Sequence, residues 1–228
     1  MLWENLERLK KRIEDACQRS GRSFNEITLV CVTKNVDIEK IKEVIKLGIK
    51  DIGENRVQEA VKKFEELRIA NCEKVRWHMV GHLQRNKAKY AVRIFDLIHS
   101  VDSLDLALEL NKQAEKVNRV QDILIQVNVS GEETKFGINP ENLLSLVKEI
   151  LNLKNLNLKG LMTIAPIVKN PEDARPHFRT LRELKDKINA ELILNPPLSV
   201  LSMGMSQDFE VAIEEGATMI RIGTAIFK

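Results

Sequence analysis

Residues 27–37 read ITLVCVTKNVD, and this stretch decides the fold class. The part from Ile27 to Thr33 is rich in β-branched residues and almost continuously apolar, which is typical of a parallel strand buried on both faces. Asp37 is placed to cap a helix whose apolar face begins at Ile38. No glycine lies between strand and helix, whereas a dinucleotide-binding sheet normally carries G-x-G-x-x-G there. The stretch therefore predicts a parallel α/β fold without the dinucleotide fingerprint.

The same alternation of strand and helix continues along the chain. An amphipathic helix precedes the first strand, and no linker of low complexity divides residues 1–228, which are predicted to form a single domain. Alternation alone leaves an open doubly wound sheet as the rival. Eight units in about 200 residues favour a closed (β/α)8 TIM barrel with an extra N-terminal helix. The predicted strands are 27–33, 49–52, 75–80, 94–100, 120–129, 158–163, 198–202 and 219–222.

The composition is that of a globular protein, with 43% hydrophobic and 30% charged residues. No apolar run approaches the roughly 20 residues that span a bilayer. The N-terminus has early acidic residues and no apolar core, so we expect no targeting segment, a cytoplasmic location and no membrane partner. The net charge is +3 with mixed signs. The basic stretch 85–89 is better interpreted as solvated helix surface than as a nucleic-acid site.

The chain has three cysteines, Cys17, Cys31 and Cys72. Their odd number and wide spacing argue against a disulfide framework. Cys17 and Cys31 lie in apolar patterns and are predicted to be buried thiols. No pair of cysteines or histidines in the sequence suggests a metal site, so we predict none.

Lys34 directly follows the first predicted strand, and functional residues of such barrels lie at the C-terminal ends of strands. We expect the barrel wall to desolvate this side chain partly, which favours the neutral amine that attacks aldehydes. An ordinary solvated lysine is the alternative, and Lys34 alone does not decide between the two.

Two loops near the end of the chain favour the first interpretation. In many barrels the loops after strands seven and eight hold a phosphate, helped by a short helix N-terminus. Each loop taken alone could simply be a tight turn, but both together, opposite Lys34, favour a phosphorylated aldehyde as the ligand. Their small and hydroxyl-bearing residues are Ser202, Gly204, Ser206, Gly223 and Thr224.

Arg221 lies on the last predicted strand, where an unpaired buried charge would be costly. One interpretation is an ion pair with Glu54 or Asp51. The other is a donor to the pyridine nitrogen of pyridoxal phosphate, a cofactor that carries both a phosphate and an aldehyde. Arginine does not give up its proton. The ring nitrogen would therefore stay unprotonated, and such a ring is a weaker electron sink.

Three further features leave alternatives open. Asn55 could bond the phenolic oxygen of the cofactor, cap the helix that follows, or do both. His82 could titrate near neutrality, although a lone rim histidine is more often a bystander. The run Lys135-Phe136-Gly137 could fold over the barrel mouth or be an ordinary loop.

The chain resembles the pyridoxal phosphate homeostasis protein family over nearly its whole length. The motifs that carry the resemblance are Val32-Thr33-Lys34, Gly53-Glu54-Asn55, residues 77–84 (WHMVGHLQ), Lys135-Phe136-Gly137, residues 160–163 (GLMT), 201–206 (LSMGMS) and 221–227 (RIGTAIF). The resemblance implies a barrel similar to the N-terminal domain of alanine racemase. It implies a Schiff base on Lys34, with Ser202, Gly223 and Thr224 near the phosphate and Arg221 near the ring nitrogen.

The resemblance also implies that the protein keeps free pyridoxal phosphate low and supplies it, through transient contacts, to apo-enzymes. A small amino-acid racemase or lyase is the alternative. A two-base racemase needs a second proton carrier, usually a tyrosine from another domain, and the only tyrosine here is Tyr90, on a predicted peripheral helix. The chain ends just after its eighth predicted strand, so we expect no covering domain, no catalytic residues and a monomer.

Overall fold

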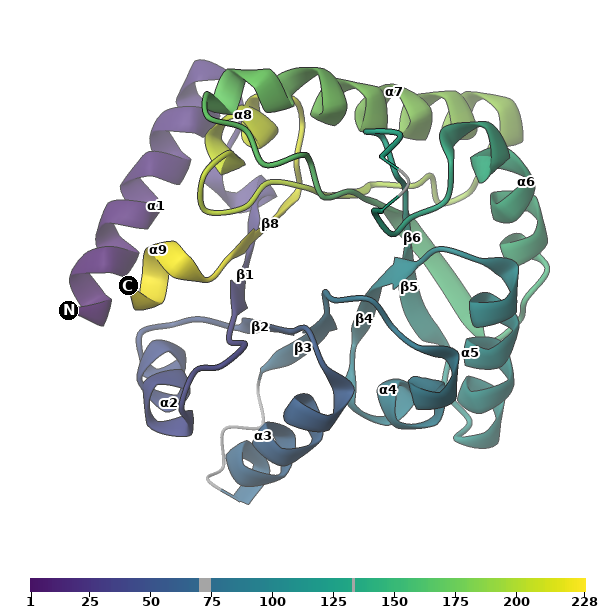
Figure 1. The fold of residues 1–228 in the computed structure, drawn as a ribbon, viewed down its shortest axis with the longest axis horizontal. Coiled ribbons are helices and arrows are strands. Elements are labelled where there is room, and N and C mark those ends of the chain that lie inside the picture. Colours follow the sequence, from purple (N-terminus) through teal and green to yellow (C-terminus); the bar gives the residue numbers. More distant parts are fainter. Residues whose placement is uncertain (70–74, 133) are drawn as a thin grey trace.

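The computed structural model describes residues 1–69, 75–132 and 134–228, in which eight parallel strands close into a barrel inside a layer of helices (Figure 1). Cys72 lies outside the described residues. The strands are β1 (Thr28–Val32), β2 (Asp51–Glu54), β3 (Arg76–Met79), β4 (Leu97–Val101), β5 (Gln121–Gln126), β6 (Leu156–Met162), β7 (Val200–Ser202) and β8 (Met219–Ile222). The α-helices are α1 (Leu2–Arg19), α2 (Ile38–Lys46), α3 (Val57–Ile69), α4 (Ala88–Ile94), α5 (Leu104–Lys116), α6 (Pro140–Leu151), α7 (Arg175–Leu192), α8 (Phe209–Glu214) and α9 (Thr224–Phe227). Short 3-10 helices are η1 (Phe24–Glu26), η2 (Arg85–Lys87) and η3 (Pro171–Ala174).

The barrel closes because β1 pairs with both β2 and β8. Val30 lies opposite Asp51 on one side and opposite Arg221 on the other. The predicted closed barrel with its N-terminal helix is therefore confirmed, and the open sheet is wrong.

The large hydrophobic core lies between the strands and the surrounding helices, as the nearly continuous apolar strands predict. The second apolar cluster is small and consists of Leu97, Leu124 and Met162, against which Val200 and Met219 pack. Cys17 and Cys31 are buried in the large core, as predicted. Burial raises the pKa of the Cys31 thiol to about 12, so this cysteine stays a neutral, core-filling group.

Most strand boundaries differ from the prediction by one to three residues, and two of these differences have identifiable reasons. β2 runs to Glu54 instead of ending at residue 52, because its polar residues are buried with partners instead of marking the strand ends. β5 ends at Gln126 instead of residue 129, since the Asn128 side chain accepts hydrogen bonds from Ser130 and Gly131 and turns the chain. The short elements η1 and α9 were not predicted.

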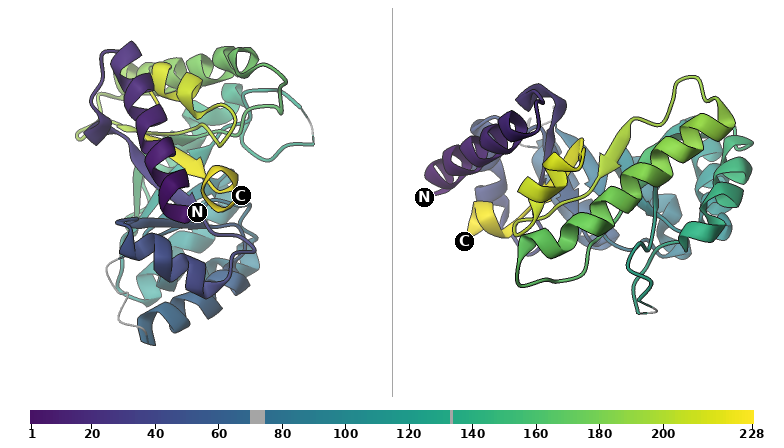
Figure 2. Two further views of the ribbon diagram at one scale, coloured as in Figure 1. Left: turned by 90° about the vertical axis from the view of Figure 1, so that its left-hand side faces the viewer. Right: turned by 90° about the horizontal axis from the view of Figure 1, so that it is seen from above.

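Helix α1 lies beside α8 and α9, so both ends of the chain meet on one side of the barrel (Figures 1 and 2). The Asn5 amide donates to the Ile226 carbonyl at 3.0 Å, and Arg12 pairs with Glu210 at 3.1 Å. These contacts hold the C-terminal segment close to the mouth of the barrel. Within the described ranges, no helix is long and apolar enough to cross a membrane.

Candidate functional site

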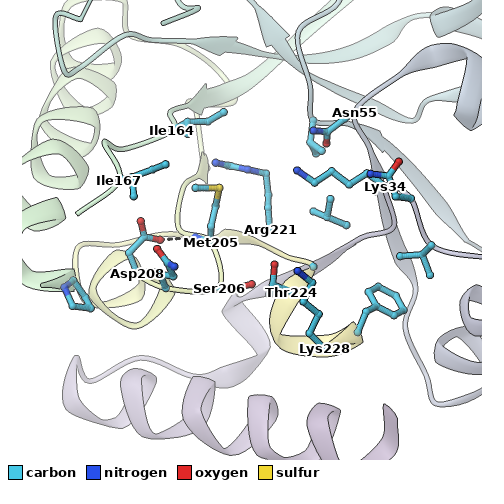
Figure 3. Close-up of a pocket in the computed structure, with 18 of the residues that line it drawn as sticks. Lys34, Asn55, Ile164, Ile167, Met205, Ser206, Asp208, Arg221, Thr224 and Lys228 are labelled. Atoms are coloured by element: carbon cyan, nitrogen blue, oxygen red, sulfur yellow. Dashed lines mark hydrogen bonds between the residues drawn. The ribbon is translucent and has the colours of Figure 1, made fainter. Parts of the chain in front are cut away.

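A cavity of about 1060 Å³ opens at the C-terminal ends of the strands. Most of its walls come from segments that follow β1, β2, β6, β7 and β8, which meet at this end because the strands are parallel. Figure 3 shows side chains from these segments converging on one space. The residues that matter below are Lys34, Asn55, Ser206, Arg221, Gly223 and Thr224.

Lys34 reaches into this cavity from the end of β1 and points toward Arg221 (Figure 3). Its side chain is exposed, so the expectation that the barrel wall desolvates it is wrong for this structure. The chain turns directly after it, because Asn35 adopts a left-handed conformation with φ of 57°. Asparagine tolerates that conformation better than most residues. The turn separates Lys34 from the helix that follows and leaves its amine free to face the cavity.

A buried ion cluster behind β1 holds the backbone on both sides of Lys34. The Lys63 ammonium donates to the Thr33 carbonyl at 2.6 Å and to Glu54 and Glu59 at 2.8 and 2.6 Å. Glu59 in turn accepts from the Asn35 backbone N–H at 2.8 Å. The peptide groups that flank Lys34 are therefore tied to one rigid cluster.

Glu54 is fully buried, more so than Lys63. Burial raises its pKa, although hydrogen bonds from Lys63 and Thr33 act in the opposite direction. Its second oxygen, Oε2, has no hydrogen-bond partner among the described residues. Removal of either bonding partner would leave a buried carboxylate poorly compensated.

Arg221 forms part of the floor of the cavity, and its guanidinium is held at two nitrogens. One donates to the Ser202 hydroxyl at 2.6 Å and the other to the Thr163 carbonyl at 2.7 Å. Burial lowers its pKa to about 10, so it remains a cation at neutral pH. The ion pair with Glu54 or Asp51 is wrong, because Glu54 binds Lys63 and Asp51 binds Arg76.

The loops after β7 and β8 lie against each other beside Arg221. The Ser206 hydroxyl accepts from the Ala225 backbone N–H at 3.3 Å, which joins the two loops. The Met205 N–H donates to Asp208 at 2.6 Å, and burial raises the pKa of that carboxyl. Together the loops bring Ser206, Gly223 and Thr224 to the cavity, and such small and hydroxyl-bearing residues are suited to phosphate.

Gly204 is required for the first of these loops to pass over α8. Its φ is +91°, and an added Cβ would lie 2.6 Å from the Ala212 side chain and 2.9 Å from the Phe209 backbone. No other residue type fits this position without moving α8.

The structure brings most of the predicted site residues together. Lys34, Asn55, Ser206, Arg221, Gly223 and Thr224 line the cavity. Ser202, the last residue of β7, and Gly204, in the loop after β7, are not among the residues that line the cavity, and the Ser202 side chain is fully buried. Ser202 is linked to the cavity through the hydrogen bond that its hydroxyl accepts from Arg221.

Sequence reasoning did not identify the apolar wall of the cavity. Ile164, Pro166 and Ile167 follow β6, and Ile167 is 92% exposed. Nothing in their residue types distinguishes them from loop residues elsewhere. It also did not identify His78 and His99, which lie buried inside strands. Polar residues at inward strand positions are the signal that could have found them.

His82 and the loop near Lys135 lie outside the lining of this cavity. The His82 ring stacks on Phe136, with centroids 3.8 Å apart, and its Nδ1 lies 3.5 Å from Asp102. Lys135 pairs with Glu132 at 2.8 Å. These contacts fasten the loop after β5 to the neighbouring strand ends.

Comparison with known proteins agrees with this geometry. The family described as "Alanine racemase, N-terminal domain" matches residues 5–228. The pyridoxal phosphate homeostasis protein of Aquifex aeolicus is 53% identical over 224 residues, which cover 98% of this chain and 96% of the relative. The protein of the same name from Haemophilus influenzae is 39% identical, with 98% and 93% covered.

The structure of PipY from Synechococcus elongatus with PLP bound superposes with a TM-score of 0.86 at 34% identity, and each chain is covered completely. The chain therefore belongs to the alanine racemase N-terminal domain family and, within it, to the pyridoxal phosphate homeostasis proteins.

Proposed function

We propose that this chain binds pyridoxal phosphate covalently through Lys34 and maintains the supply of this cofactor without turning over a substrate of its own. The observation that carries the proposal is a lysine amine facing a buried guanidinium across one cavity, beside two loops that bring Ser206, Gly223 and Thr224 to it. The names of the relatives and the PLP-bound PipY structure support it.

The cavity residues fit the four polar groups of this cofactor. Pyridoxal phosphate supplies an aldehyde that condenses with a primary amine. Lys34 provides that amine, and Ser206, Gly223 and Thr224 provide donors for the phosphate. Arg221 is the donor for the ring nitrogen, and Asn55 for the phenolic oxygen. Ser202 and Gly204 do not contact the cofactor in this arrangement. Ser202 holds Arg221 in place, and Gly204 allows the phosphate loop its conformation.

A supply role fits the described cavity better than racemisation or lyase chemistry. Tyr90, the only tyrosine of the chain, lies on α4 and is not among the residues that line the cavity. Arg221 keeps a ring nitrogen unprotonated, which weakens the electron sink that such chemistry needs. The proposal includes a cytoplasmic monomer that meets apo-enzymes transiently.

The first experiment locates the covalent bond. The protein is loaded with pyridoxal phosphate, reduced with borohydride and digested, and the modified peptide is identified by mass spectrometry. We expect the label on Lys34 and its loss in Lys34→Ala. Lys40→Ala is the matched control, because Lys40 lines the same cavity and should leave the label in place. A label on another lysine, such as Lys135, would contradict the assignment.

The second experiment separates supply from catalysis. The loaded protein is mixed with a pyridoxal-phosphate-dependent apo-enzyme, and recovery of that enzyme's activity is followed. In parallel, the loaded protein is incubated with several L-amino acids. We expect recovery of the apo-enzyme and no D-isomer or keto acid. Turnover of an amino acid would favour the racemase or lyase alternative.

A further inference from the structure

The interior of this barrel contains a column of polar side chains. Barrel interiors of this fold are normally filled by branched aliphatic residues. Here buried polar residues from five strands meet inside the barrel, below the floor of the cavity. They are Asp51 on β2, His78 on β3, His99 on β4, Ser202 on β7 and Arg221 on β8.

Continuous hydrogen bonds join this column from one end of the barrel to the other. Asp51 Oδ1 lies 2.9 Å from His78 Nε2, and His78 Nδ1 lies 3.0 Å from His99 Nε2. His99 Nδ1 lies 2.9 Å from the Ser202 hydroxyl, which also meets Arg221 at 2.6 Å. At the opposite end, the exposed Arg76 binds both oxygens of Asp51 at 2.8 Å.

The chemistry of the two ends fixes the direction of every hydrogen bond. Arginine only donates and a carboxylate only accepts, so Ser202 accepts from Arg221 and His78 Nε2 donates to Asp51. A neutral imidazole has one donor and one acceptor. Among the described residues, His99 Nδ1 is the acceptor that the buried Ser202 hydroxyl reaches, so Ser202 donates to it, and His99 Nε2 donates to His78 Nδ1. All protons of the column point from the cavity toward Asp51.

The surroundings keep the His99 imidazole neutral. His99 is fully buried, and burial, His78 and the Arg221 charge all lower its pKa well below the usual range. The pKa of Asp51 is lowered, because hydrogen bonds from His78 and Arg76 outweigh the effect of burial. Asp51 therefore stays ionised and available as the final acceptor.

We propose that this column is a positioning device for Arg221, with His78, His99 and Ser202 as positioning residues for recognition of the ring nitrogen. The inference rests on the proposed binding of pyridoxal phosphate. The column holds the acceptor of one guanidinium nitrogen in place, and the Thr163 carbonyl holds the other. Two of the five donors of arginine are used in this way, so the remaining donors keep a fixed direction toward the cavity. Because its only proton is donated to His99, the Ser202 hydroxyl acts through Arg221 and does not bind the phosphate.

The protein without added cofactor provides the first test. Long-range ¹H–¹⁵N spectra of the histidine side chains report which ring nitrogen carries the proton. From the hydrogen bonds, we expect the rings of His78 and His99 to carry the proton on Nε2 and to have a bare Nδ1. His82 and His177, which lie outside the column, provide the comparison in the same spectrum. A proton on Nδ1 of either column residue, or a doubly protonated ring, would overturn the proposal.

The second test compares pyridoxal phosphate with its deaza analogue, in which a C–H replaces the ring nitrogen. We expect the wild-type protein to prefer the natural cofactor about tenfold, which corresponds to one charge-assisted hydrogen bond. Ser202→Ala and His99→Leu break the column on either side of the same hydrogen bond and should reduce this preference to about onefold to threefold. Ser206→Ala, on the phosphate loop, is the matched control and should weaken both ligands equally.

The outcomes of these tests are distinguishable. If both column variants retain the full preference, the positioning role is refuted while cofactor binding stands. If the wild-type protein binds neither ligand, the proposed function itself fails. Circular dichroism shows whether the variants fold. If they do not, the histidine ¹H–¹⁵N spectra of the wild-type protein still test the direction of the hydrogen bonds in the column.

Discussion

Lys63→Met should destabilise the protein, because the buried Glu54 carboxylate would lose its cationic partner. Lys63 is nearly buried and donates to Glu54, Glu59 and the Thr33 carbonyl. Methionine fills a similar volume but provides no charge and no donor. Breaking a buried ion pair at one partner costs about 3–5 kcal/mol, since the other charge stays buried. We expect a loss of that size in the free energy of unfolding near neutral pH.

The loss should depend on pH in a defined direction. The pKa of Glu54 is already raised by burial, while Lys63 acts to lower it. Without Lys63 the folded-state pKa rises further, so the folded protein binds a proton more readily than the unfolded chain. The destabilisation should therefore be fully present above the raised folded-state pKa and shrink as the pH falls through it, toward about pH 5.

Denaturant unfolding, followed by circular dichroism at several pH values, measures both effects. Lys10→Met is the matched control, because Lys10 pairs with Glu7 at the same 2.8 Å but at the surface. That pair should be worth less than about 1 kcal/mol. Equal losses in the two variants, or a loss in Lys63→Met that does not shrink at low pH, would refute the reasoning. Glu54→Gln should recover part of the stability when combined with Lys63→Met.

Four further outcomes are expected. Lys34→Ala should change the free energy of unfolding by less than about 0.5 kcal/mol, because the side chain is exposed, and a larger change in denaturant unfolding would show a structural role. Pyridoxal without its phosphate should bind roughly a hundredfold more weakly in equilibrium titration, since two or more charge-assisted hydrogen bonds are lost. Gly223→Asp should weaken binding more than Arg221→Ala, because it adds a negative charge to the phosphate loop, and the reverse order would exchange the two roles. Gly204→Ala should lower the free energy of unfolding by roughly 2 kcal/mol or more, as a left-handed backbone and a clash with α8 combine, and thermal unfolding would detect this.

The local pattern of residues was sufficient to predict the architecture. Stretches such as 27–33 are apolar on both faces and flanked by helix caps, so burial and element type can be predicted from neighbours in the sequence. The strand ends then follow in order around the barrel, which is why Lys34, Arg221 and the loop 202–206 could be assigned to one mouth.

The roles of buried polar residues were decided only by the tertiary structure. From the sequence, Arg221 could pair with Asp51, with Glu54 or with a ligand. In the structure, Glu54 pairs with Lys63 and Asp51 with Arg76. Nothing local shows that His99 bonds Ser202, because 103 residues separate them. Hydrophobic periodicity reports whether a side chain is buried, whereas the partner of a buried polar atom depends on distances of a few ångströms between distant strands, which exist only once the barrel has closed.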